Sequence, residues 1–271
     1  MNLTEANYYG LESNHSFMSV SQLKTFQKCE AAAMAELNGT YEPERGRALI
    51  LGSYVDEALT GTEESFAKFC EENHSELYQK RGDKKLADVI QADEAIRRVR
   101  EQPLMMKYLG GEHQTIMTGE IAGVPFKGKF DSYKPREFIA DLKYVKSLRS
   151  PNMFENFIDY WKYTTQMAVY QELVYQNTGE RLPCYIVAVT KENPPHVAVC
   201  EIDQFTLDNE LEEVKKLAPH YQKIKNGEIQ AERCDAYDCD YCAQSKVLTE
   251  PIPYEQVAMS ANQIKAMRGE L

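Results

Sequence analysis

The sequence predicts an α/β protein in which a helical N-terminal part, residues 1–110, precedes an α/β/α core over residues 111–226. Helical periodicity dominates up to about residue 101, and the alternating apolar pattern typical of strands begins at residue 120. The chain has 271 residues, 43% of them hydrophobic, which allows one large domain or at most two small ones. We expect a single domain over residues 1–271, which ends in a cysteine-containing segment, residues 227–271.

Helical patterns occupy most of the N-terminal part. Ser19 or Ser21 can cap a first helix that runs to about Leu37, where Asn38 and Gly39 end it. Further helices are predicted over residues 47–59, 63–72 and 84–101.

The core is predicted to alternate strands and helices. Residues 120–130 read as two strands turned at Ala122 and Gly123, and residues 138–145 read as the next strand. Pro151 precedes a long helix over residues 153–175 that ends at Thr178 and Gly179, and the apolar positions of this helix include Phe154. A hairpin over residues 184–191 and 196–203 and a helix over residues 207–226 follow. This order is the basis for the predicted α/β/α core.

Asp131, Asp141 and Lys143 are the strongest functional candidates. The break before residue 138 allows Asp131 and Asp141 to lie at the ends of neighbouring strands, and Asp141 and Lys143, two residues apart, face the same side of one strand. Two carboxylates and an ammonium suit a hard divalent cation beside a phosphodiester better than they suit a core. The alternative is a strand edge whose charges face water.

The pattern Asp-(x)9-Asp-x-Lys resembles the motif of the PD-(D/E)xK nucleases. Gln166 and Tyr170 lie four residues apart on the predicted helix and therefore share one face. Their spacing after a strand that carries Asp-x-Lys resembles the RecB-type branch of that superfamily. The amide of Gln166 can contact a phosphate, water or metal ligand, and the ring of Tyr170 can stack on a base or its hydroxyl can contact a phosphate. An exposed Gln and a half-buried Tyr are the alternative.

Asp56 is the third candidate metal ligand. RecB-like families carry Gly-x-x-x-His before the sheet, with the histidine as a metal ligand, and here Gly52 is followed by Asp56 at the histidine position. An aspartate also binds magnesium or manganese. Glu57 is a competing ligand, and a surface carboxylate is the alternative for Asp56.

Four cysteines form a second candidate centre. Cys234, Cys239 and Cys242 follow the spacing Cys-x4-Cys-x2-Cys, and Cys29 stands alone near the N-terminus. This arrangement resembles the iron-sulfur nucleases of the AddB and CRISPR-associated groups, in which one N-terminal and three C-terminal cysteines hold a 4Fe-4S cluster. The triplet departs from the Cys-x2-Cys-x5-Cys spacing of those groups, and four thiolates suit either a cluster or structural zinc. Free thiols in a tail are the alternative.

Taken together, the chain resembles the RecB/RecE-like phage exonucleases of the exonuclease VIII type, with a restriction-endonuclease-like α/β/α core. The resemblance implies a magnesium- or manganese-dependent site with Asp56, Asp131 and Asp141 as metal ligands and Lys143 beside them. Gln166 and Tyr170 would support it and contact the DNA. The family digests linear double-stranded DNA for recombination, next to single-strand annealing recombinases, and some members assemble as homo-oligomeric rings.

The formal net charge of −11 opposes nonspecific adhesion to nucleic acid but does not set the potential in a groove. Basic residues gather in residues 80–100 and around the candidate site, although ordinary solvated faces explain the first of these groups equally well.

No run is long enough to span a membrane, the N-terminus lacks a signal-peptide pattern, and the cysteine usage fits a reducing compartment, so we expect a cytoplasmic protein in a bacterial host. Two other functions stay open: a repair or adaptation nuclease that prefers single strands, and a noncatalytic DNA-binding protein on a decayed nuclease fold.

Overall fold

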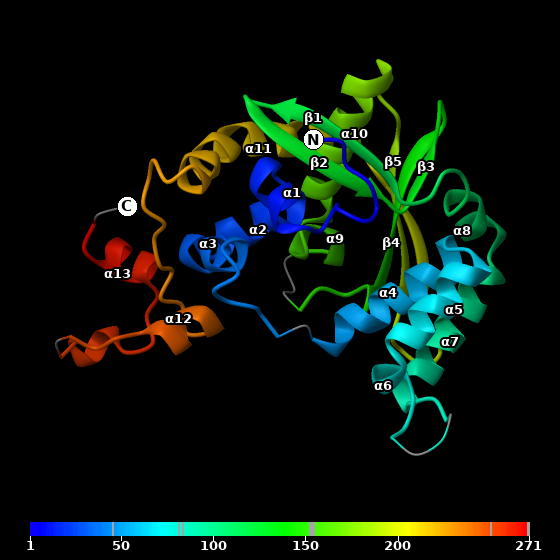
Figure 1. The fold of residues 1–271 in the computed structure, drawn as a ribbon, viewed down its shortest axis with the longest axis horizontal. Coiled ribbons are helices and arrows are strands. Elements are labelled where there is room, and N and C mark those ends of the chain that lie inside the picture. Colours follow the sequence, from blue (N-terminus) through cyan, green and yellow to red (C-terminus); the bar gives the residue numbers. More distant parts are fainter. Residues whose placement is uncertain (45, 81, 83, 152–154, 250, 270–271) are drawn as a thin grey trace. The chain divides into compact units, whose positions relative to one another are not determined.

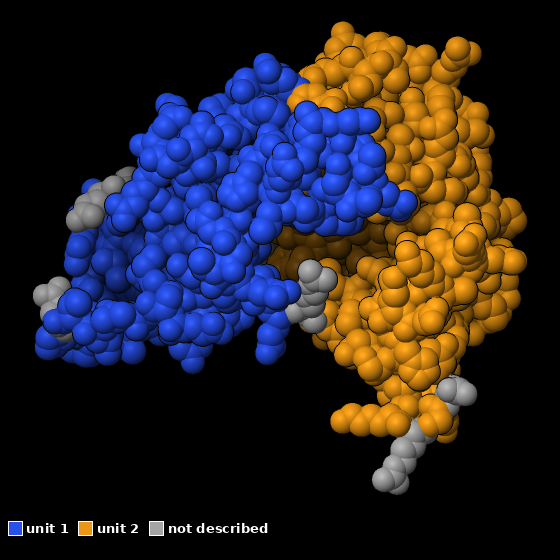
Figure 2. Space-filling model, viewed as in Figure 1, with its two compact units in different colours: residues 1–44, 120–126, 215–271 blue, residues 45–119, 127–214 orange. Residues whose placement is uncertain are grey.

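A computed structural model describes residues 1–271 except 45, 81, 83, 152–154, 250 and 270–271 (Figure 1). The chain forms two compact units that do not follow the order of the sequence (Figure 2). Unit 1 contains residues 1–44, 120–126 and 215–271, and unit 2 contains residues 45–119 and 127–214. The single domain with the three parts 1–110, 111–226 and 227–271 stays a prediction.

The N-terminal helices of unit 1 differ from the predicted single helix that ends at Leu37. They are α1 (Leu11–Ser16), α2 (Val20–Lys28) and α3 (Glu30–Leu37). Ser19 caps α2 as predicted, because its side chain accepts a hydrogen bond from the main-chain N–H of Gln22 at 3.2 Å. The prediction of one continuous helix is wrong because Cys29 is extended, with φ −162° and ψ 111°, and interrupts the helical hydrogen bonding.

The helices of unit 2 before the sheet agree with the predicted ones within a few residues. They are α4 (Arg47–Thr60), α5 (Glu63–Glu72), α6 (His74–Leu77), α7 (Ala87–Arg100) and α8 (Pro103–Tyr108). The short helices α6 and α8 were not predicted, because four to six residues carry too little periodicity to detect.

The hairpin predicted over residues 120–130 is present. Its strands are β1 (Thr115–Ile121) and β2 (Val124–Phe130), which pair with each other. Ala122 and Gly123 both have positive φ, 51° and 77°, as in the turns that favour tight hairpins. The strand β1 begins five residues earlier than predicted.

A four-stranded sheet in the order β3-β4-β5-β6 forms the centre of unit 2. Its strands are β3 (Ser132–Lys134), β4 (Phe138–Val145), β5 (Cys184–Thr190) and β6 (Val197–Ile202). The pair β4–β5 is parallel and the other two pairs are antiparallel. The strand β4 and the hairpin β5–β6 were predicted from the sequence, whereas the three-residue β3 was not.

The two faces of β4 are distinct. Phe138, Ala140 and Leu142 belong to a hydrophobic cluster that includes side chains of α4 and α7. Asp141 and Lys143 alternate with them and therefore face the other side, where α10 contacts β4 and β5. Helices thus cover both faces of the sheet, and the predicted α/β/α core is confirmed.

The helix predicted over residues 153–175 is divided in the structure. Its described parts are α9 (Phe157–Tyr160) and α10 (Tyr163–Thr178), separated at Lys162, whose left-handed φ of 52° breaks the helix. The predicted start at residue 153, with Phe154, lies outside the described residues. Gly179, with φ 77°, ends α10 as predicted.

The last helices follow the sheet in sequence. They are α11 (Gln204–Lys225), α12 (Asp240–Ser245), the 3-10 turn η1 (Tyr254–Gln256) and α13 (Ala261–Met267). Of these, α11 was predicted to within three residues. None of the helices in the described part of the chain is both long and apolar enough to cross a membrane.

Candidate active site and cysteine cluster

The strand β4 presents Asp141 and Lys143 side by side. The side chain of Asp141 is 1% exposed, and its Oδ2 forms an ion pair with the Nζ of Lys143. The Lys143 ammonium also lies 4.9 Å from the centroid of the Tyr163 ring. Burial lowers the pKa of Lys143, but the carboxylates of Asp141 and Asp131 raise it, and the net shift is upward. The side chain therefore stays protonated at neutral pH.

Asp131 lies between β2 and β3, directly opposite the middle of β4. Its Oδ2 accepts a hydrogen bond from the main-chain N–H of Leu142 at 3.0 Å, which fixes the carboxylate against β4. Burial, and then repulsion from Asp141 and Asp56, raise the pKa of Asp131 well above its usual range. The prediction that both aspartates lie at strand ends holds only for Asp131. Asp141 is in the middle of β4. The unpredicted β3, whose Ser132 pairs with Ala140, brings Asp131 back alongside it.

Asp56 approaches these carboxylates from α4. Burial raises the pKa of Asp56, as does the charge of Asp141, while a 3.0 Å hydrogen bond from the Thr60 hydroxyl opposes the shift. Glu57, the competing candidate, instead accepts a hydrogen bond from the Ser65 hydroxyl at 2.9 Å, which directs it toward the start of α5. The structure thus brings Asp56 rather than Glu57 to the candidate site.

The carboxylates suit a hard divalent cation. Asp56, Asp131 and Asp141 face one ammonium, that of Lys143, so the group has an excess of negative charge that a cation would neutralise. Among the described residues, the four cysteines are the group whose possible ligand atoms all lie close together, within 4.8 Å of one another. The three carboxylates do not form such a closed cage. Magnesium does not require such a cage, because it usually binds one or two carboxylates together with water and substrate phosphates.

Gln166 and Tyr170 join α10 to this site. The Nε2 of Gln166 donates to Oδ1 of Asp141 at 2.7 Å and contacts the Tyr170 hydroxyl at 3.2 Å. The Tyr170 hydroxyl donates to the main-chain oxygen of Lys129 at 2.8 Å, and its buried ring packs against Phe130 with centroids 4.4 Å apart. As the structure stands, these two side chains hold Asp141 in place and do not offer a ring for base stacking.

Two further residues next to the carboxylates escaped the sequence analysis. Gln114 has a positive φ of 53°, and its Nε2 donates to Oδ2 of Asp56 at 3.1 Å. The Nδ1 of His113 lies 2.9 Å from the main-chain oxygen of Asp131. Both residues belong to an irregular segment before β1, where no periodicity marks them.

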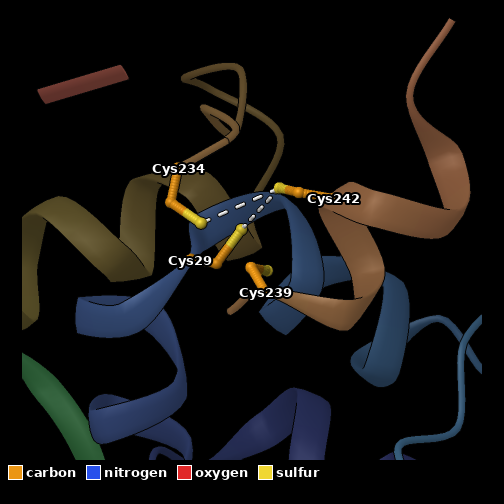
Figure 3. Close-up of side chains that lie close together, drawn as sticks. All are labelled: Cys29, Cys234, Cys239 and Cys242. Carbon is orange, nitrogen blue, oxygen red and sulfur yellow. Dashed lines mark hydrogen bonds between the residues drawn. The ribbon is translucent and has the colours of Figure 1, made fainter. Parts of the chain in front are cut away.

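The four predicted cysteines come together within unit 1. Figure 3 shows Cys29 at the start of α3, Cys234 in the segment after α11, and Cys239 and Cys242 at α12. The Sγ of Cys242 lies 3.7 Å from that of Cys29 and 3.8 Å from that of Cys234, and all four sulfurs lie within 4.8 Å of one another. Three of the four are buried and Cys234 is half-buried. The side chains therefore form a cluster and are not free thiols in a tail.

Comparisons with known proteins agree with this geometry. A model of the PDDEXK-like domain of unknown function DUF3799 matches residues 19–245. The chain belongs to this family. A crystal structure of a "putative exonuclease" from Eubacterium rectale is 38% identical, with a TM-score of 0.89, and the match covers 96% of this chain and 99% of the other. None of the curated proteins matches.

Membership of the PDDEXK-like family confirms the predicted resemblance to PD-(D/E)xK nucleases. The family match extends from residue 19 to residue 245 and so includes every candidate residue of both centres. The RecE-like specificity, the roles of the individual residues and the identity of the metals stay predictions.

Several basic residues of this PDDEXK-like domain form ion pairs. Lys85 pairs with Asp93 at 2.7 Å, and Arg97 pairs with Glu94 and Glu101 on α7. Arg81 lies outside the described residues. For residues 80–100 the structure thus favours the alternative of a solvated face with alternating charge.

We expect Gln114→Ala to lower the affinity for the catalytic cation by about 10- to 100-fold, the usual effect of losing a side chain that orients a metal ligand. Without the amide, nothing from this side holds Oδ2 of Asp56. Cleavage measured against magnesium concentration should show a higher midpoint with a nearly unchanged maximal rate. Gln176→Ala is the matched control, since its amide donates to Glu172 at 2.7 Å on the exposed side of α10. An unchanged midpoint in Gln114→Ala would show that Asp56 needs no such support.

Proposed function

We propose that this protein is a metal-dependent exodeoxyribonuclease that hydrolyses phosphodiester bonds of linear double-stranded DNA. The observation that carries the proposal is the buried Asp141, which Lys143 and Gln166 contact at its two carboxylate oxygens. With Asp56 and Asp131 it offers the hard oxygen ligands that magnesium or manganese prefers. When bound there, such an ion polarises the phosphate and lowers the pKa of a coordinated water.

The protein's own groups would then have separate tasks. The Lys143 ammonium stabilises negative charge that develops on the phosphate, or orients the attacking water. Gln166 and Tyr170 position Asp141 and connect it through the Lys129 carbonyl to β2, so that the carboxylate cannot rotate away. The intact network supports a working enzyme over a decayed nuclease fold, because a binding protein has no need of a buried carboxylate held on both oxygens.

Exonuclease action and a role in phage recombination rest on resemblance. The relative from Eubacterium rectale is described as a "putative exonuclease". The order of motifs in this chain is similar to that of RecE-like proteins. On this basis we propose action in the bacterial host cytosol together with a single-strand annealing recombinase, and assembly into a homo-oligomeric ring.

The expected result is that linear duplex DNA is degraded in the presence of magnesium, that EDTA stops the reaction, and that closed circular duplex survives. A catalytic cation is needed for the chemistry, and an exonuclease needs a free end. End-labelled linear DNA and the same DNA as a covalently closed circle, incubated side by side, provide the measurement.

The other outcomes distinguish the alternatives. Cutting of the closed circle would indicate an endonuclease, and faster cutting of single strands would indicate a repair or adaptation nuclease. Binding of DNA without cleavage under any divalent metal would indicate a noncatalytic protein. A thermal shift with manganese reports metal binding independently of cleavage, since a ligand that binds the folded state raises its stability.

A further inference from the structure

The sulfur–sulfur distances in the cysteine cluster are those of a single ion. Zn–S bonds of about 2.3 Å place four tetrahedral thiolates about 3.8 Å apart. The Sγ of Cys242 lies 3.7 Å from that of Cys29 and 3.8 Å from that of Cys234, and all four sulfurs lie within 4.8 Å of one another. In a 4Fe-4S cluster each thiolate binds a different iron, so the sulfurs must be separated by an iron–iron edge and two outward bonds, on the order of 6 Å. The four cysteines of this chain are too close together for such a cluster.

The same distances exclude disulfides among these cysteines as they are placed. A disulfide requires sulfurs about 2.05 Å apart, and all four cysteines are free. A contact of 3.7 Å is too long for that bond.

Main-chain groups around the sulfurs are arranged to stabilise thiolates. The N–H of Ala236 donates to the Sγ of Cys234 at 3.5 Å, and the left-handed Asp235, with φ 46°, forms the turn that permits this. Such N–H···S bonds are typical of the surroundings of metal-bound thiolates.

An outer layer of contacts fixes the loops that carry the cysteines. The guanidinium of Arg233 donates to the carbonyl of Cys242 at 2.7 Å, to the hydroxyl of Ser245 at 2.7 Å and to Asp235 at 3.0 Å. Its positive charge next to Cys242 also offsets the negative charge that four thiolates around one divalent ion retain.

A third set of contacts joins the N-terminal and C-terminal segments of unit 1. The main-chain N–H of Ala31 donates to the Glu232 carbonyl at 3.0 Å, and the N–H of Glu232 donates to the Glu30 carboxylate at 2.9 Å. The extended backbone of Cys29, which divides α2 from α3, is what turns its sulfur toward the other three. The ligands are thus held in place by hydrogen bonds outside the cluster itself.

We propose that Cys29, Cys234, Cys239 and Cys242 bind one zinc ion and not the 4Fe-4S cluster that the family resemblance implies. A closed tetrathiolate zinc site has no open position and no redox activity, so its role is to hold α3 and the C-terminal segment together. The site contributes to folding and takes no part in DNA hydrolysis or redox sensing.

Elemental analysis of the full-length protein, purified anaerobically, tests the proposal without any reference to cleavage. The expected result is about one zinc per chain, iron far below one per chain, and a colourless solution. Replacing zinc with cobalt(II) should give the intense ligand-field bands of a tetrahedral thiolate site. About four irons with four acid-labile sulfides and a brown colour would overturn the proposal, as would metal-free protein in which a pair of these cysteines is oxidised.

Variants locate the ion. We expect Cys239→Ser to reduce the zinc content at least tenfold, whereas Cys200→Ser on β6 should retain it fully. If Cys239→Ser does not fold, the thiols of the wild-type protein can instead be titrated with a mercurial while zinc release is measured. Release of one zinc after modification of four thiols supports the site. Unchanged zinc in folded Cys239→Ser would overturn it.

Discussion

Asp141→Asn and Lys143→Ala are expected to reduce DNA cleavage by about 10²- to 10³-fold, the scale of losing a preorganised electrostatic group in an active site. Asparagine keeps the shape of Asp141 but removes the charge that holds a cation, and alanine removes the ammonium that faces the phosphate. Single-turnover digestion of end-labelled linear duplex at saturating magnesium is the measurement. Lys68→Ala, an exposed change on α5, is the matched control and should cleave at the wild-type rate.

The stability of these variants separates a catalytic role from a structural one. Lys143→Ala leaves Asp141 buried without its counter-charge, and breaking a buried pair costs about 3–5 kcal/mol, so its melting temperature should fall. Asp131→Asn should lose activity to the same extent without a lower melting temperature. Its amide oxygen can still accept from Leu142, and the repulsion from Asp141 and Asp56 disappears. An active Asp131→Asn or Asp141→Asn, free of contaminating nuclease, would exclude this carboxylate group as the active site.

Cys29→Ser is expected to lose the bound metal and to lower the melting temperature on the order of 10 °C, which is the shift for a few kcal/mol in a chain of this size. A metal that binds Cys29 and Cys234 joins segments about two hundred residues apart, and this closure restricts the unfolded chain. Structural zinc adds binding free energy on the order of 10 kcal/mol in small peptides, only part of which is lost if three thiolates remain.

Thermal unfolding, metal content and limited proteolysis measure this effect together. Proteolysis should begin in the segment that follows Glu232, because the hydrogen bonds of Glu232 to α3 lose the ion that aligns them. Cys70→Ser is the matched control, since that half-buried thiol on α5 belongs to unit 2. Full metal retention with an unchanged melting temperature in Cys29→Ser would show that Cys29 is not a ligand.

Among the described residues, the sequence by itself predicted the strands of more than three residues, and it predicted α4, α5, α7 and α11 to within three residues. Strand alternation marked β4 to the residue, and Gly123 and Gly179 marked a turn and a helix end because only a few residue types tolerate positive φ. These signals are local, and so a single sequence is sufficient to detect them.

The candidate site was predictable where residue type and short spacing carry the chemistry. The pairs Asp141 with Lys143 and Gln166 with Tyr170 share a face because of strand and helix periodicity, and the structure brings them to one carboxylate. The dense run of Cys234, Cys239 and Cys242 indicated a metal site, whereas Cys29 was assigned to it only through the family resemblance; the structure brings all four together. The spacing did not give the separation of the sulfurs, on which the choice between zinc and a cluster depends.

The tertiary structure alone decided the contacts between distant segments. It placed Gln114 on Asp56 and turned Glu57 away, it positioned Asp131 opposite the middle of β4, and it interrupted a strongly helical segment at Cys29. In each case the deciding partner is far away in sequence or the backbone conformation opposes the local propensity. Periodicity reports which face of an element a residue occupies, whereas packing between elements determines which side chain that face meets.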